Sequence, residues 1–228
     1  MTRRTRDEAG LGLAEMMVVI MLMGLLSALV LSFTTTVSRK VADSQVMNVN
    51  TNEATAAVNA TARMLRGAVN LQVRNQPINT PAFVEAGPTA VAFYTVVDTE
   101  PATTRPMLVR FEVTPEGNLL EMRWLPDATS TPPFWTFASA AGPPSSSRVV
   151  AHGLTATPGN PLFVYLRSDQ ATPIVGAGPG GALTPAQRTG TIGAVRVNAQ
   201  VQTFPGGRAA PTTLTSTVGL RNLPEGSS

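Results

Sequence analysis

One long apolar run dominates the hydrophobic pattern and lies close to the N-terminus. Residues 11–33 contain a single charged side chain, Glu15. As a helix, about 23 residues would extend about 35 Å, which is enough to cross about 30 Å of hydrocarbon. Arg3, Arg4 and Arg6 precede the run, and basic residues favour the cytoplasmic side of a membrane. The pattern therefore predicts a membrane-spanning helix with its N-terminus inside.

After residue 33 the chain becomes polar but keeps a helical period. Apolar residues recur at steps of three to five, which is typical of an amphipathic helix: Val41, Met47 (or Val46), Val49, Ala54, Val58, Ala62, Leu65 and Val69. No proline interrupts the chain before Pro77. We therefore expect one nearly continuous helix from about residue 12 to about residue 70, with residues 34–76 as an amphipathic extension.

From residue 77 to residue 228 the pattern changes to short apolar runs separated by turn residues. Val109, Phe111 and Val113 alternate with polar residues, and the segment 115–118 reads as the turn of a hairpin over 107–125. The predicted strands are 82–86, 90–97, 107–113, 118–125, 148–151, 162–167, 192–204 and 213–221. This order predicts an α+β fold, in which an antiparallel β-sheet head packs on the long N-terminal helix.

Two segments of the head, 126–147 and 171–191, are rich in Pro, Gly, Ser and Thr and are predicted loops. The first contains Phe134, Trp135 and Phe137. These aromatic residues form either a short strand or core contact, or an exposed contact patch. The second contains four glycines, Gly176, Gly178, Gly180 and Gly181. It lacks the Gly-Lys-Ser/Thr ending of a P-loop, so we expect a flexible loop.

The composition offers little for catalysis. The chain has no cysteine and one histidine, His152, at the end of a predicted strand, where a surface or edge role is expected. We find no paired-carboxylate motif, no H-E-x-x-H and no G-x-S-x-G. Seventeen basic residues face fourteen acidic ones without forming a cluster, so there is no strong nucleic-acid signal. We predict that the protein is not an enzyme and has no catalytic residue, cofactor or metal.

The apolar run is open to three interpretations: a secretory signal peptide, a generic signal anchor, or an anchor in which Glu15 has a purpose. The run is too long for an ordinary signal peptide and lacks a clear small-x-small cleavage site. A carboxylate at the centre of a membrane helix costs about 2.5–3.5 kcal/mol. Near the cytoplasmic end, Glu15 either reaches the interface at lower cost or has a partner.

The residues around Glu15 narrow these possibilities. A basic leader, Gly10, the sequence Leu11-Gly12-Leu13-Ala14-Glu15 and an unbroken apolar helix resemble the class III (prepilin) signal of type IV pilins and type II secretion pseudopilins. Leu11 stands where Phe is usual, and Gly12 where Thr or Ser is common. The resemblance covers about 25 residues and combines leader charge, the glycine, the spacing to the glutamate and the length of the run.

The resemblance implies how this chain would be processed. Prepilin peptidase would cut between Gly10 and Leu11, remove residues 1–10 and methylate Leu11. The carboxylate of Glu15 would then pair with the N-terminal ammonium of a neighbouring subunit and so guide filament assembly. The implied partners are other pilin or pseudopilin subunits, an assembly platform protein and membrane lipid.

Two weaker similarities point to a minor subunit. The segment 62–68 and the ending Val218-Gly219-Leu220-Arg221-Asn222 are similar to parts of W-type minor pilins and J-type pseudopilins, although the C-terminal disulfide of many such proteins is absent here. The expected protein is a structural subunit in the bacterial cytoplasmic (inner) membrane, with an extracytoplasmic head that enters a surface or periplasmic filament. The alternative is a membrane-anchored envelope binding module that does not polymerise.

Overall fold

A computed structural model describes residues 12–72, 79–96, 105–137, 142–157, 159–189, 191–204 and 210–223. The chain divides into two units between Gln45 and Val46. One helix, α1 (Leu13–Arg66, 54 residues), contributes to both. The prediction of one nearly continuous helix is therefore confirmed, and the fold is α+β.

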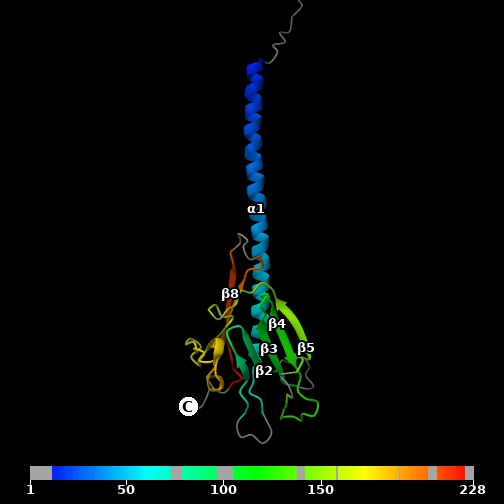
Figure 1. The fold of residues 1–228 in the computed structure, drawn as a ribbon, viewed down its shortest axis with the longest axis vertical. Helices are drawn as coiled ribbons and strands as arrows, with labels where there is room; N and C mark the ends of the chain where they lie inside the picture. Colours follow the sequence, from blue (N-terminus) through cyan, green and yellow to red (C-terminus); the bar gives the residue numbers. More distant parts are fainter. Residues whose placement is uncertain are drawn as a thin grey trace, which may run out of the picture. The chain divides into compact units, whose positions relative to one another are not determined.

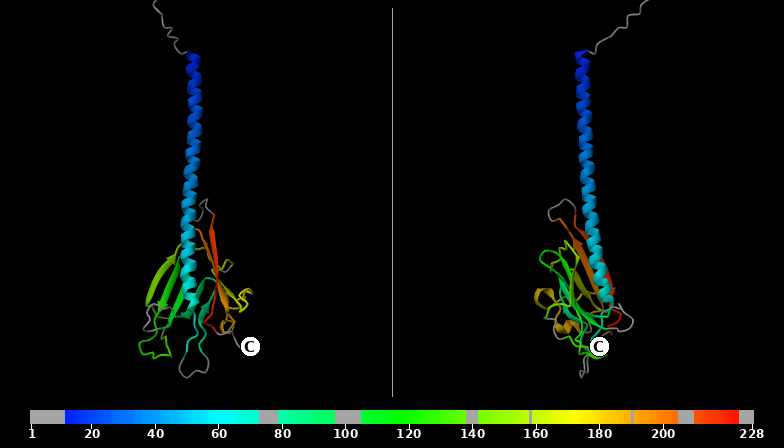
Figure 2. Two further views of the ribbon diagram at one scale, coloured as in Figure 1. Left: turned by 180° about the vertical axis from the view of Figure 1, so that it is seen from behind. Right: turned by 90° about the vertical axis from the view of Figure 1, so that its right-hand side faces the viewer.

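Up to Gln45, every described residue of α1 is exposed. From Val46 onward the helix contributes one face to the core of the second unit. The buried residues of this face recur at steps of one to four: Asn50, Ala54, Ala57, Val58, Thr61, Ala62, Met64 and Leu65. In Figure 1 this part of α1 lies behind the β-sheets, and in the reverse view of Figure 2 it lies in front of them. The sheets therefore use one stripe of the helix as their packing surface.

Two details of the helix prediction are wrong. Val41, Met47 and Val49 are exposed, whereas Val46, the alternative to Met47, is half-buried, and Asn50 is fully buried. The helix also stops at Arg66, short of residues 70 and 76. Residue 67 passes so close to the end of strand β2 (Ala90–Thr95) that a Cβ atom there would lie 2.4 Å from the carbonyl oxygen of Val96, the next residue. Only glycine fits at that approach, and the chain leaves the helix there.

The larger sheet has five antiparallel strands in the order β1-β2-β3-β4-β5. These strands are β1 (Phe83–Ala86), β2 (Ala90–Thr95), β3 (Met107–Val113), β4 (Leu119–Trp124) and β5 (Ser146–Ala151). Val109 and Phe111 are fully buried, so the predicted alternation in β3 is confirmed. The predicted hairpin is β3–β4, and its turn contains Gly117 at φ +79°, a conformation that favours glycine.

A second sheet of three strands has the order β6-β7-β8. Its strands are β6 (Phe163–Leu166), β7 (Ala194–Val201) and β8 (Thr212–Gly219). The sequence pattern predicts one sheet, and the structure has two. Phe163 N–H donates to the carbonyl of Pro88 at 3.1 Å, but no ladder joins β1 to β6. Pro88 lies in the connection between β1 and β2 and has no N–H, so it returns no hydrogen bond to β6.

The segment 171–191 is more regular than the predicted flexible loop. It contains a 3₁₀ turn, η1 (Pro179–Gly181), and a short helix, α2 (Pro185–Arg188). Thr184 and Gln187 form a reciprocal capping box at the start of α2. Leu183 is buried, and its N–H donates to the carbonyl of Ala86 in β1 at 2.7 Å. The segment is therefore attached to the edge of the larger sheet.

Candidate functional site

Glu15 lies in the first turn of α1, where its carboxylate faces the start of the helix. The N–H of Gly12 donates to Oε2 of Glu15 at 3.3 Å. This is half of a capping box, in which the third helical residue reaches back to the N-cap backbone. The helix dipole also favours a negative charge in the first turn. Glu15 therefore has a local hydrogen-bonding role within its own helix.

The helix that follows Glu15 exposes apolar side chains on all sides. Every large apolar side chain from Leu13 to Phe33 is more than half exposed, with the smallest exposed fraction, 55%, at Val19. Soluble proteins rarely expose apolar patches larger than a few hundred Å². By length and composition, α1 is the one helix of the described chain that could cross a membrane. This surface requires cover from lipid or from other apolar helices.

The cleavage prediction falls outside the described residues. Both Gly10 and Leu11 lie before the first described position, Gly12. Processing between Gly10 and Leu11, and methylation of Leu11, therefore remain predictions.

In the second unit, polar contacts attach α1 to the ends of the strands. Asn50 is fully buried, and its Oδ1 accepts hydrogen bonds from the N–H and hydroxyl of Thr203, at 3.1 and 2.7 Å. The hydroxyl of Thr95 donates to the carbonyl of Met64 at 2.7 Å. The Nδ2 group of Asn50 is buried without a hydrogen-bond partner among the described residues, so the bonds to its Oδ1 and to the carbonyl of Met64 are the ones that favour one position of the helix on the sheets.

His152 follows β5, as predicted for a surface histidine, and its side chain is 60% exposed. Its backbone N–H donates to Oε2 of Glu53 on α1 at 2.7 Å, and its Nδ1 lies 3.5 Å from the same oxygen. The strongest contact is thus made by the backbone. His152 therefore links the end of β5 to α1, and none of these contacts indicates catalysis.

The sequence prediction missed a buried carboxylate. Glu121 in β4 has a side chain with no exposed surface, and it lies between two arginines. Its Oε2 accepts from Nε and Nη2 of Arg148 at 2.9 and 2.6 Å, and its Oε1 accepts from Nε of Arg123 at 2.5 Å. Charge-assisted, paired bonds of this kind are the strong ones in proteins. Alternation in β4 could have indicated that Glu121 faces inward, but not that Arg148 lies opposite.

The opposite face of the larger sheet carries a second small core. Trp124 packs there with Ala92 and Leu108, and the ring of Phe137 lies 5.2 Å from that of Tyr94. For Phe137 the core-contact alternative is therefore confirmed. Trp135 is half-buried and Phe134 is 37% exposed. The three aromatic residues do not form one exposed patch.

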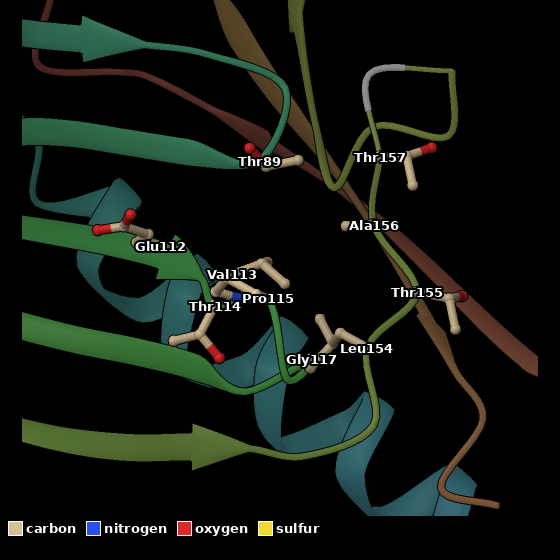
Figure 3. Close-up of a pocket in the computed structure, with 10 residues that line it drawn as sticks. All are labelled: Thr89, Glu112, Val113, Thr114, Pro115, Gly117, Leu154, Thr155, Ala156 and Thr157. Atoms are coloured by element: carbon tan, nitrogen blue, oxygen red, sulfur yellow. The ribbon is translucent and has the colours of Figure 1, made fainter. Parts of the chain in front are cut away.

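A shallow hollow of about 510 Å³ lies where the turn after β3 meets the segment 154–157. Figure 3 shows Thr155 and Thr157 pointing away from Val113 and Pro115 across the gap. The hydroxyl of Thr155 lies 3.2 Å from Oε1 of Gln200, and that of Thr157 accepts from the N–H of Asn160 at 3.1 Å. These hydroxyls are already used within the fold, so the hollow lacks the converging polar groups of a ligand site.

Within the described residues, no group of three or more His, Cys, Asp or Glu side chains could hold a metal ion. A scan against protein-family models finds no match for this chain, and no curated protein matches its sequence. The features that bear on function are therefore the exposed apolar helix, Glu15 in its first turn, and the charged groups on the head.

Proposed function

We propose that this protein is a minor pilin or pseudopilin, a structural subunit of a type IV pilus or a type II secretion-like filament. The observation that carries the proposal is α1 itself. Its first part exposes large apolar side chains all round, and its second part is the packing surface of a β-rich head. One helix can thus occupy a membrane or a filament core while it also carries a folded head.

Processing is the first step of the proposed function. Prepilin peptidase removes residues 1–10 and methylates Leu11, while the membrane-spanning part of α1 holds the protein in the cytoplasmic membrane with its N-terminus inside. The support is the residue pattern around Gly10 and the three arginines before it. Glycine at the cleaved bond lets a protease approach the backbone closely.

The mass of the intact protein from its host tests this step. We expect loss of residues 1–10 and one added methyl group. Gly10→Val places a branched side chain at the cleaved bond and should leave the protein full-length, whereas Gly12→Val should be processed normally. An unprocessed wild-type N-terminus would refute the proposal.

Glu15 is the residue proposed to guide assembly. At 3.3 Å its bond to Gly12 N–H is long for a hydrogen bond to a carboxylate. The ammonium of a neighbouring subunit is a stronger partner for a carboxylate in an apolar filament core. The competing function, an anchored binding module that does not polymerise, is favoured by the same contact, because capping alone accounts for Glu15.

A pair of substitutions separates these two functions. Glu15→Gln keeps the shape and a hydrogen-bond acceptor but removes the charge, so membrane insertion should be unchanged and entry into filaments should be lost. Asp43→Asn removes a carboxylate from the exposed part of the same helix and should leave both unchanged. Quantitative immunoblots of membrane and sheared-filament fractions provide the measurement. Absence of the wild type from the sheared-filament fraction would favour the non-polymerising module, and normal filament entry of Glu15→Gln would show that its charge does not guide assembly.

A further inference from the structure

The two sheets of the head have four edges, and loop segments cover two of them. At β1, Leu183 N–H donates to the carbonyl of Ala86. At β6, Ile174 N–H donates to the carbonyl of Tyr165 at 2.8 Å. No described segment pairs with the outer edges of β5 and β8. Unpaired N–H and C=O groups on a strand edge are a template for another strand.

Of the two open edges, β5 is the more exposed. Its first four residues, from Ser146 to Val149, are all exposed, and they include an apolar side chain, Val149, that is 44% exposed. Edge strands that must stay unpaired usually carry Pro or an outward charge that discourages pairing. The strand β5 contains no proline, and its one charged side chain, Arg148, is bound to Glu121. The backbone edge is therefore accessible.

The charges beside this edge indicate what would bind there. Glu121 lies opposite Arg148 on one side and opposite the buried Phe111 on the other. These side chains are therefore on the face of the sheet that carries the core. Two guanidinium groups share the one carboxylate of Glu121, and the side chain of Arg148 remains 52% exposed. A positive charge is thus left beside the open edge. The strand β8 has no charged residue.

We propose that β5 is a docking edge for an extended strand of a different protein, with a carboxylate opposite Arg148 and an apolar side chain opposite Val149. Residues directly opposite in neighbouring strands have Cβ atoms about 5 Å apart, so opposite charges there attract and like charges repel. Side chains alternate between faces, which places the apolar neighbour over Val149.

A second copy of the chain is a poor occupant. In the described part of the chain, the strands that carry a carboxylate are β1, β3 and β4. The strands β3 and β4 are paired on both sides, and the segment 171–191 covers the edge of β1 through Leu183. Within the described residues, a second copy thus offers no free strand that carries a carboxylate, and a strand of another protein is the occupant we propose. This inference concerns the head alone and holds whether or not the protein enters a filament.

Two synthetic peptides test the proposal on the full-length protein in detergent micelles. Each peptide alternates Thr and Val, and they differ only in a central Glu or Lys. We expect the Glu peptide to bind about five- to tenfold more tightly and to slow hydrogen–deuterium exchange in the segment 146–149. Equal binding of both peptides, no binding, or protection of β8 in place of β5 would each overturn the proposal.

Matched variants identify the groups responsible. Arg148→Gln should reduce the preference for the Glu peptide to about twofold or less, while Arg196→Gln on β7 should leave it unchanged. If Arg148→Gln weakens folding, Val149→Lys provides the test, because it leaves the ion pairs of Glu121 intact. The lysine at position 149 places a charge on the face of the sheet opposite to Arg148, where an apolar side chain of the peptide would lie, so it should weaken binding of both peptides. Unchanged binding by both β5 variants would overturn the proposal.

Discussion

The two parts of α1 are hydrophobic in different ways. Between Leu13 and Phe33 the apolar side chains are large and exposed on every side. Between Asn50 and Leu65 most of them lie on one face and are buried, and three of the buried ones are alanines, Ala54, Ala57 and Ala62. The helix is regular in both parts, so helix propensity does not distinguish them. The arrangement of apolar residues around the axis does.

The comparison shows what each surface needs. A helix that is apolar all round requires an apolar environment on all sides, which lipid or a bundle of helices provides. A helix with one apolar stripe needs only one packed surface, and the small side chains of Ala54 and Ala57 allow that surface to come close. Substitutions at matched positions in the two parts should therefore have opposite consequences.

The largest expected effect is at Leu65, which is fully buried. Leu65→Ala should lower the free energy of unfolding by about 2–5 kcal/mol, because it removes buried methyl groups and leaves a cavity. Met47→Ala changes a side chain that is 60% exposed on the same helix. Its effect should be below about 0.5 kcal/mol. Denaturant unfolding of the head, followed by tryptophan fluorescence, measures both, and similar values would contradict the assigned packing.

The next effect concerns the exposed part of α1. Leu22→Arg should oppose membrane insertion by about 2.5–3.5 kcal/mol, because it places a charge near the centre of the apolar run. Thr55→Arg introduces the same residue at an exposed position in the second part of the helix and should leave insertion unchanged. The carbonate-resistant membrane fraction of each variant measures this. Equal loss of both from the membrane would show that α1 is sensitive to charge everywhere.

A smaller effect is expected at Glu121. Glu121→Gln leaves Arg123 and Arg148 without their shared charge and should destabilise the head by about 1–3 kcal/mol. The estimate is below that for a fully buried pair because Arg148 is half exposed. Glu85→Gln breaks a more exposed ion pair with Arg110 and should cost less than about 1 kcal/mol. Thermal unfolding midpoints compare them, and a larger effect at Glu85 would contradict this ranking.

The smallest effect should appear only in acid. Asp169 accepts hydrogen bonds from Thr172 and from the N–H of Ala171, which lower its pKa from 3.8 to about 2. Its contribution to stability is therefore present above about pH 4 and is lost as the pH falls toward 2. The unfolding midpoint of Asp169→Asn should lie below that of the wild type at pH 6 and coincide with it near pH 2. A difference that persists at pH 2 would contradict this.

Much of the fold follows from local pattern. The start of α1, the alternation in β3 and the turn at Gly117 were predicted because each depends on neighbouring residues. The end of the helix could also have been predicted from Arg66-Gly67, since a glycine after a basic last turn is a common helix ending. The expectation of a longer helix gave too much weight to Val69.

Other features depend on residues far apart in the chain. Asn50 is buried because Thr203 meets it, and the two are 153 positions apart. Glu121 is buried because two arginines enclose it, and Arg148 comes from a strand that starts after a long connection. The structure of the segment 171–191 depends on Leu183 reaching β1. No local pattern carries these pairings.

By itself, the sequence determined the apolar run, the three arginines before it, the position of Glu15 and the succession of one helix and short strands. These are one-dimensional properties, because hydrophobic periodicity acts within a few residues. Only the tertiary structure decided which face of α1 is buried, where the two sheets separate, which of their edges are covered, and that Arg148 stands beside an open edge. Those outcomes depend on packing and pairing between distant segments, where burial and hydrogen bonding outweigh local preference.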